Sequence, residues 1–244
     1  MLNIVLPMAG KSIFFESSEY IYPKPLIEVR GKTMIELVIK NLNEFNIEKQ
    51  FIFILKNEDC TKYHIDDTIK LLTDDKAIII YVEGDTRGAV CTALLSIEHI
   101  NNNDQLIIVN SDQIIENSLN TAHAEFLKNN YDAAVITFES VHPKWSYIKL
   151  DADNKVNETA EKKPISKNAI AGLYYFKKGK YFVDAAFRSI EKDVNLNGLY
   201  FIAPVLNELI LKNYHVGSFA ISSSNYHSFY SPQKIQEYEI LSQQ

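Results

Sequence analysis

Polar residues and glycines follow short apolar runs of strand length at several points in the sequence. The first such segment is Pro7 to Gly10, which precedes Lys11 and, further along, Lys24 between two prolines. A glycine after a strand lets backbone N–H groups approach a phosphate, and proline rings stiffen the backbone that carries the lysine. This pattern indicates a phosphate site. The alternative interpretation is a tight turn and a surface lysine.

Two later segments have the same arrangement. In the stretch 83–89, Thr86 is a predicted helix N-cap and Gly88 stands where a helix is expected to begin. A helix N-terminus offers N–H groups and positive potential to a phosphate or a polar base edge. Asp112 follows the apolar run 107–109. Mg²⁺ takes one or two carboxylates together with substrate phosphates, so Asp112 is a candidate metal ligand. A turn or helix-capping role is the alternative for Asp112.

Alternating strand-like and helix-like segments must position these residues. The expected strands among the first 140 residues are 2–6, 50–55, 77–82, 105–109 and 133–138. The expected helices between them are 34–45, 61–72, 88–100 and 119–129. This alternation predicts an α/β fold with a mostly parallel, doubly wound sheet. Ligands bind such sheets outside the carboxyl ends of the strands, where all three segments fall.

The second part of the chain has a different pattern. The expected strands are 147–150, 155–159, 169–176 and 216–221, and the expected helices are 181–189, 200–211 and 232–241. The first two strands turn through residues 151–154, which predicts a smaller antiparallel portion. Because no long linker separates the two parts, residues 1–244 are expected to form one domain.

Composition narrows the class of protein. A chain of 244 residues with 46% hydrophobic and 23% charged residues is typical of a globular α/β protein. A net charge of -6 argues against a nucleic-acid partner. Cys60 and Cys91 are the two cysteines, and their spacing excludes a disulfide scaffold or a structural zinc site. The sequence shows no signal peptide and no membrane-spanning run, so we expect a cytoplasmic protein without membrane insertion.

The order of several sequence blocks resembles that of sugar-phosphate nucleotidyltransferases, the NDP-sugar pyrophosphorylase-like family. The resemblance covers nearly the whole chain, and its blocks are the loop after residue 6, Pro23 to Val29, Gly31 to Glu36, Thr86 to Ala89, Asn110 to Gln113, Glu161 with Lys162, Ala171 to Phe176 and Tyr200 to Asn207. The resemblance implies a GT-A-like fold. It also implies transfer of NMP from an NTP to a sugar 1-phosphate or a similar small phosphate, with release of pyrophosphate, in the supply of surface polysaccharide precursors.

The resemblance implies roles for individual residues. Lys24 would bind the α-phosphate and stabilise the charge that develops on it, and Asp112 would hold Mg²⁺, the expected cofactor. The other residues expected to bind the nucleotide are Pro7, Met8, Ala9, Gly10, Lys11, Glu83, Thr86 and Gly88. The residues expected to bind the acceptor are Ser111, Glu161, Gly172 and Lys162, or Lys163 if the register shifts by one. Residues 1–140 would form the nucleotide-binding half and residues 141–244 the acceptor-binding half. Members of this family are often dimers or tetramers, so the resemblance allows a homo-oligomer, and the sequence leaves the oligomeric state open.

Three positions depart from the family pattern. Ser12 and Phe14 stand where the loop of the family has a glycine and an arginine, and Ser228 stands where a second metal-binding aspartate is frequent. Each change weakens phosphate or metal binding. The departures support an alternative, a catalytically impaired paralogue that binds a nucleotide or sugar nucleotide and acts through a partner. The apolar run 13–15 fits this alternative as an exposed interaction surface. The other interpretation of Phe15 is an aromatic ring that packs inward and anchors the loop.

A nucleotide-sugar-dependent glycosyltransferase is the third interpretation. Such enzymes commonly hold a metal with an Asp-x-Asp pair after a strand. Here Ser111, Asp112 and Gln113 provide one carboxylate, so this interpretation ranks below the other two.

Lys11 is a candidate replacement for the missing arginine charge. If its ammonium reaches the same phosphates, Lys11→Ala should weaken NTP binding as much as Lys24→Ala does, because each variant removes one cation from the triphosphate. Titration calorimetry with both variants measures the effect. Wild-type NTP affinity in Lys11→Ala would show that Lys11 does not bind the triphosphate.

Overall fold

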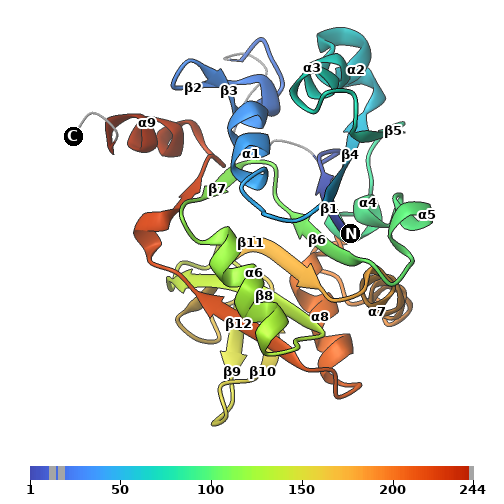
Figure 1. The fold of residues 1–244 in the computed structure, drawn as a ribbon, viewed down its shortest axis with the longest axis vertical. Helices are drawn as coiled ribbons and strands as arrows, with labels where there is room; N and C mark the ends of the chain where they lie inside the picture. The colour runs from blue at the N-terminus through green and yellow to red at the C-terminus, as the bar shows by residue number, and fades with distance from the viewer. Residues whose placement is uncertain (11–14, 16–19, 242–244) are drawn as a thin grey trace.

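A nine-stranded sheet forms the centre of the molecule in the computed structural model, which describes residues 1–10, 15 and 20–241 (Figure 1). Four neighbouring strands run parallel in the order β6, β1, β4, β5. Their bounds are β1 (Leu2–Pro7), β4 (Lys49–Lys56), β5 (Ile78–Val82) and β6 (Gln105–Val109). The carboxyl ends of these strands therefore lie along one edge of the sheet.

The later strands extend this sheet, as the sequence predicts. They are β8 (Ala133–Glu139), β9 (Tyr147–Leu150), β10 (Val156–Ala160), β11 (Asn168–Phe176) and β12 (Val216–Ala220). Strand β11 pairs antiparallel with both β6 and β8, while β12 pairs parallel with β8. The α/β fold with an antiparallel portion is confirmed. The expectation that β8 continues the parallel run directly is wrong, because β11 lies between β6 and β8.

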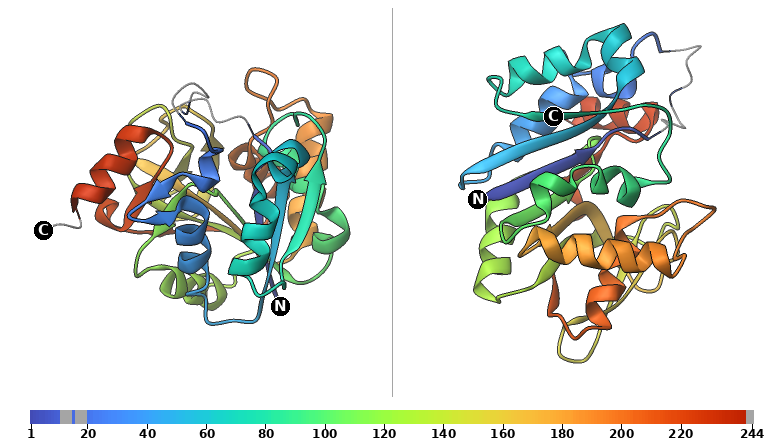
Figure 2. Two further views of the ribbon diagram at one scale, coloured as in Figure 1. Left: turned by 90° about the horizontal axis from the view of Figure 1, so that it is seen from above. Right: turned by 90° about the vertical axis from the view of Figure 1, so that its right-hand side faces the viewer.

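Both faces of the sheet are covered because apolar side chains alternate along the strands. In β4, Phe51, Phe53 and Leu55 belong to one apolar core, and Ile52 and Ile54 belong to another. The first core is completed by α1 (Met34–Leu42), α3 (Ile65–Leu72) and α6 (Leu119–Lys128). The second is completed by α4 (Ala89–Leu94), α7 (Gly179–Glu191) and α8 (Ile202–Ile210). Figure 2 shows α1 and α3 on one side of β1 and β4, and α4 and α7 on the other.

Two predicted helices are each divided into two. The expected helix 61–72 consists of α2 (Asn57–Tyr63) and α3, separated by His64 in the left-handed conformation, with φ of 54°. The expected helix 88–100 consists of α4 and α5 (Ile97–Ile100). Helix α2 begins directly after β4, so its first residues lie at the edge where the parallel strands end.

Short elements around that edge were not predicted. They are the 3-10 helices η1 (Lys24–Leu26) and η2 (Ser223–Asn225), the hairpin of β2 (Glu28–Val29) and β3 (Lys32–Thr33), and the pair of β7 (Gln113–Ile115) with β13 (Tyr226–Ser228). The terminal helix α9 (Pro232–Leu241) packs beside them. These elements share a third apolar cluster, which includes Phe15, Met34, Phe229 and Tyr238. Phe15 is only 9% exposed, which agrees with the interpretation that its ring packs inward and not with an exposed surface at this residue.

Neither a membrane span nor a disulfide occurs in the part of the chain that the structure describes. None of its helices has both the length and the apolar character needed to cross a bilayer. Cys60 and Cys91 are free thiols.

Gly172 is a glycine that packing requires. It lies within an irregularity of the β11–β8 pairing, and its φ is +60°. A Cβ at this position would overlap the side chains of Asn110 and Gln113. We expect Gly172→Ala to lower the free energy of unfolding by about 1–3 kcal/mol, from backbone strain and displaced neighbours. Urea denaturation measures this change.

Gly10→Ala is the matched control for this substitution. A Cβ on Gly10 would meet open space. The free energy of unfolding of this variant should therefore stay within about 0.5 kcal/mol of wild type. Equal stability of Gly172→Ala and Gly10→Ala would contradict the packing role of Gly172.

Candidate active site

A cleft of about 720 Å³ opens at the carboxyl ends of β1, β4 and β6. Its walls include six of the residues expected to bind the nucleotide or the acceptor: Pro7, Met8, Gly10, Lys24, Ser111 and Asp112. Ala9 is buried directly beneath them. The structure therefore brings the first and third sequence segments together, at the edge where open α/β sheets bind ligands.

An ion pair between Lys24 and Asp112 crosses this cleft. The ammonium of Lys24 donates to a carboxylate oxygen of Asp112, and each side chain is 18% exposed. Lys24 also lies 5.6 Å from the centre of the Phe15 ring. Partial burial strengthens the attraction between the two charges, because less water screens them than at an open surface. Each residue is thus held, with its charge balanced, at the floor of the cleft.

Local backbone structure sets the position of Lys24. Pro23 has φ of -63° and begins the 3-10 turn of η1, in which Leu26 N donates to Pro23 O at 2.9 Å. Pro25 follows Lys24 directly, so the rings on both sides limit the backbone around the lysine. The stiffened lysine that the sequence predicts is present as a short helical turn.

Backbone hydrogen bonds at Asn110 and at Asp112 itself hold the position of Asp112. Just before it, Asn110 N donates to Gly172 O at 3.0 Å, which ties the end of β6 to β11. The carbonyl of Asp112 accepts from Phe229 N at 2.7 Å, and β7 begins at the next residue. The carboxylate therefore rests on a backbone that two other segments hold in place.

The donor groups around Asp112 fit a metal ion that is also bound by phosphate oxygens. Among residues 1–10, 15 and 20–241, no group of three His, Cys, Asp or Glu side chains is arranged to hold a metal. Ser228 pairs with Gln113 across the β7–β13 sheet, next to Asp112, where the resemblance expects a second carboxylate. One carboxylate with phosphates and water is a ligand set that Mg²⁺ accepts.

The cleft has a further wall that sequence reasoning missed. Lys56, Glu58, Asp59 and Tyr63, from the end of β4 and from α2, line it. Lys56 is 13% exposed and binds Asp85 at 2.8 Å. Burial raises the pKa of the Asp59 carboxyl, and the neighbouring Glu58 adds to this shift. The signal that could have found these residues is their place after a buried parallel strand, the same rule that identified Asp112.

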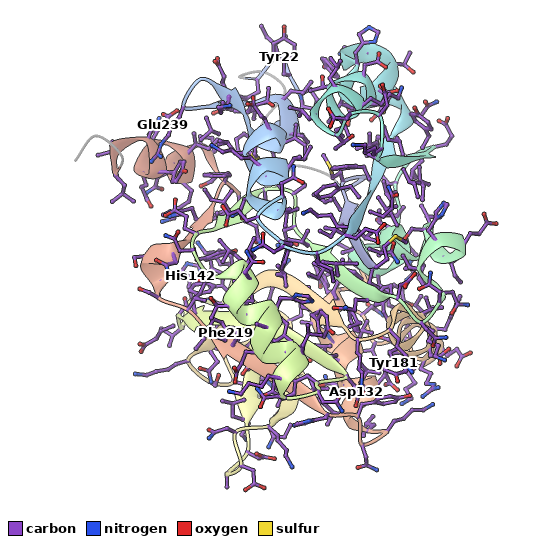
Figure 3. All side chains as sticks on the ribbon, viewed as in Figure 1. Tyr22, Asp132, His142, Tyr181, Phe219 and Glu239 are labelled. Atoms are coloured by element: carbon purple, nitrogen blue, oxygen red, sulfur yellow. The ribbon has the colours of Figure 1, made fainter. Side chains whose placement is uncertain are left out.

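Tyr22 and Tyr63 close one end of the cleft. Their rings meet edge to face with centres 6.2 Å apart, and both residues line the cleft. Tyr22 stands between the β2–β3 hairpin and the α2–α3 pair (Figure 3). The loop before η1 and the helix after β4 are thus in contact across the opening.

The loop 83–88 lies beside the cleft, and none of the residues described as lining the cleft comes from it. Glu83 accepts from the Asn57 amide at 2.6 Å. The prediction of Thr86 as N-cap is wrong, because Gly88 occupies the N-cap of α4 and the hydroxyl of Thr86 instead lies 2.5 Å from that of Thr92. Gly88 has φ of 99°, and a Cβ on it would lie 2.5 Å from Tyr200 O. Packing against Tyr200 therefore explains this glycine before any ligand is considered.

Glu161 and Lys162, two of the residues expected to bind the acceptor, lie further along the sheet than Ser111. Glu161 accepts from the Ser146 hydroxyl, and burial raises the pKa of its carboxyl, while Ser146 and Lys162 oppose that shift. The Lys162 ammonium lies 4.9 Å from the centre of the Phe201 ring, and Phe201 lines the cleft. Lys162 and Lys163 are both exposed. The contact with Phe201 therefore favours Lys162 over Lys163 as the residue that faces the site.

A buried tyrosine lies near each of the two carboxylates Asp112 and Glu161. The Tyr226 hydroxyl donates to Gln113 Oε1 at 3.0 Å, beside Asp112. Burial raises the pKa of Tyr226 and of Tyr174, and the charges of Asp112 and Glu161 respectively add to these shifts. Tyr226 thus lies near Asp112, and Tyr174 lies near Glu161.

Three of the predicted positions, Lys11, Ser12 and Phe14, lie outside the described residues. The described part of the site consists of residues from the ranges 1–10 and 20–241, together with Phe15.

Known proteins with similar sequences and structures indicate the family. A family model described as nucleotidyl transferase matches residues 20–220. The bifunctional protein GlmU of Methanocaldococcus jannaschii is 24% identical over 180 residues, which cover 72% of this chain. That of Methanococcus maripaludis is 29% identical over 180 residues, which cover 71% of this chain. The aligned residues are 40% and 39% of these two relatives, so the chain matches less than half of their length.

Solved structures show the same fold. The nucleoside-diphosphate-sugar pyrophosphorylase from Vibrio cholerae RC9 has a TM-score of 0.85 at 24% identity, and the match covers 97% of this chain and 99% of that one. The inositol-1-phosphate CTP transferase from T. maritima has a TM-score of 0.74 at 16% identity, covering 99% of this chain and 94% of that one. Since the family model spans residues 20–220 of the 244, and the fold and cleft agree with it, the chain belongs to the nucleotidyl transferase family.

Proposed function

We propose that this protein transfers a nucleotidyl group from an NTP to a sugar 1-phosphate or a similar small phosphate. The observation that carries the proposal is the Lys24–Asp112 ion pair on the floor of the cleft. The main obstacle to this reaction is the negative charge on the phosphates. A lysine that can bind phosphate oxygens and a carboxylate that can bind a metal ion both reduce this obstacle.

The reaction is a displacement at the α-phosphorus. An oxygen of the acceptor phosphate forms a bond to this phosphorus, the bond to the bridging oxygen breaks, and pyrophosphate leaves. Lys24 donates to the α-phosphate oxygens as their negative charge grows. Met8 and Gly10 present backbone to the nucleotide at the end of β1. The residues thus act mainly by position and charge.

Asp112 is the residue that would hold Mg²⁺. When bound, the ion neutralises charge on the triphosphate. Binding of the nucleotide with its metal gives Asp112 a cation and Lys24 a phosphate, so each keeps an opposite charge when the ion pair separates. Residues of the 1–140 half bind the nucleotide, and Glu161 and Lys162 of the other half bind the acceptor.

A binding protein without catalysis is the second candidate function. The observation that favours it is Ser228, which lies across from Gln113 where a second carboxylate would complete the metal site. A hydroxyl is a weaker ligand for Mg²⁺ than a carboxylate. The binding protein would bind a nucleotide without releasing pyrophosphate, whereas the transferase would release it.

Substitution of Lys24 or Asp112 tests the proposed catalytic pair. We expect Lys24→Ala and Asp112→Ala each to slow pyrophosphate release by about 100-fold or more, since each removes charge stabilisation from the transition state. The assay contains Mg²⁺, the four NTPs and a panel of acceptor phosphates. Lys128→Ala removes an exposed lysine on α6 and should keep the wild-type rate. Undiminished release in both cleft variants would rule out these roles.

Gly10→Ala tests close approach of the nucleotide to the backbone. A Cβ here meets open space facing the cleft, so folding should be unaffected while the methyl group intrudes on a bound triphosphate. We expect the NTP affinity to fall about tenfold. Calorimetric titration with the best NTP measures it. An unchanged affinity would place the nucleotide away from Gly10.

A further inference from the structure

A second, smaller pocket of about 180 Å³ lies beside the cleft. Phe201 lines both the pocket and the cleft. The described walls of the smaller pocket are mostly apolar. They consist of Val194, Leu196, Leu199, Phe201 and Pro204 with Glu161 and Asn195. The pocket therefore continues from the proposed reaction centre toward the acceptor side of the site.

The hairpin 193–200 gives this pocket a preformed wall. Leu196 and Leu199 exchange backbone hydrogen bonds of 3.0 and 3.1 Å. The Tyr200 hydroxyl donates to Asp193 at 2.6 Å, which holds the base of the hairpin closed. Arg87 Nε donates to Gly198 O at 3.3 Å and joins the tip to the loop 83–88. A ligand would thus meet a shaped surface instead of having to order one.

The pocket offers few polar groups to a ligand. Glu161 and Asn195 are its polar side chains among the described residues. The amide of Asn195 is already engaged, because its nitrogen donates to Asp193 Oδ1 and its oxygen accepts from Gly198 N, both at 2.8 Å. A hexose buried here would leave several hydroxyl groups without partners, which is costly. Methyl and methylene groups would instead match the walls.

Two adjacent side chains of opposite charge stand at the border of the pocket. Glu161 belongs to its lining, and the Lys162 ammonium lies over the ring of Phe201. The ring of Phe201 thus already contacts one ammonium group. Opposite charges at this spacing are complementary to a small molecule that carries a phosphate at one end and a cationic amine at the other.

We propose that the acceptor is a phosphorylated, alkylated amino alcohol, whose phosphate lies toward Lys162 and whose ammonium group enters the pocket of Glu161 and Leu199. This inference rests on the proposed function and narrows its acceptor class. The phosphate of such a compound attacks the α-phosphorus as a sugar phosphate would, and pyrophosphate leaves in the same way.

Two measurements on the full chain test this inference. The first compares pyrophosphate release with phosphocholine and phosphoethanolamine against glucose 1-phosphate and glucosamine 1-phosphate. We expect the value of kcat/KM for an amino alcohol phosphate to exceed that for either hexose phosphate by about 100-fold. A preference for the hexose phosphates would overturn the inference and leave nucleotidyl transfer intact.

The second measurement uses a substitution whose larger side chain fills the pocket. Leu199 is 41% exposed, so Leu199→Trp can add volume without disturbing the core. We expect this variant to raise KM for phosphocholine about tenfold while KM for the NTP stays within about twofold. Leu211→Trp is the matched control, since Leu211 is 70% exposed and lies outside the lining of the pocket. Equal acceptor KM in both variants would overturn the inference.

A direct titration separates failure of the inference from failure of the proposed function. Phosphocholine binding is measured calorimetrically in the wild type, in Leu199→Trp and in Leu211→Trp. Binding that is lost only in Leu199→Trp, without any pyrophosphate release, would support the pocket and reject nucleotidyl transfer. Absence of phosphocholine binding to the wild type would overturn the inference.

Discussion

The ion pair between Lys24 and Asp112 is the interaction on which the rest of the site depends. It joins a short turn between two prolines to the segment that follows the buried strand β6. Each charge is partly shielded from water and would be costly to leave alone. A ligand that brings both an anion and a cation can replace the pair without leaving either residue unbalanced. This exchange is the basis of the proposal that the cleft binds a nucleotide together with its metal.

The antiparallel portion of the sheet holds the backbone that carries Asp112 in place through hydrogen bonds. Strand β11 lies against β6, and its Gly172 carbonyl accepts from the backbone of Asn110, two residues before Asp112. Gln113 donates to Ala171 O and accepts from the Tyr226 hydroxyl, so β11, β7 and β13 share one polar contact. Ile170 N of β11 also donates to Ser146 O at 2.8 Å, and the Ser146 hydroxyl donates to Glu161. Strand β11 therefore contacts both the proposed nucleotide side and the proposed acceptor side.

Short sequence patterns identified the site residues that are positioned by a single turn or by the end of a single strand. Lys24 between prolines and Asp112 after an apolar run are both in the cleft, because a short turn and a parallel strand set their places. Lys56, Glu58 and Asp59 were missed, although they lie at the end of the buried strand β4 or just after it, as Asp112 follows β6. Gly88 and Gly172 were assigned to ligands, although each also accommodates a segment distant in the sequence. The pairing of β11 between β6 and β8 depends on tertiary packing and could not be inferred from periodicity.

The central claim is that the Lys24–Asp112 cleft catalyses nucleotidyl transfer, and ³¹P NMR of the reaction mixture tests it most directly. Wild-type protein is incubated with Mg²⁺, an NTP and an acceptor phosphate. Our account predicts that signals of a new diphosphate linkage and of pyrophosphate grow together in equal amounts as the triphosphate and the acceptor disappear. Triphosphate signals that shift or broaden on binding, with no product formed for any acceptor, would contradict it.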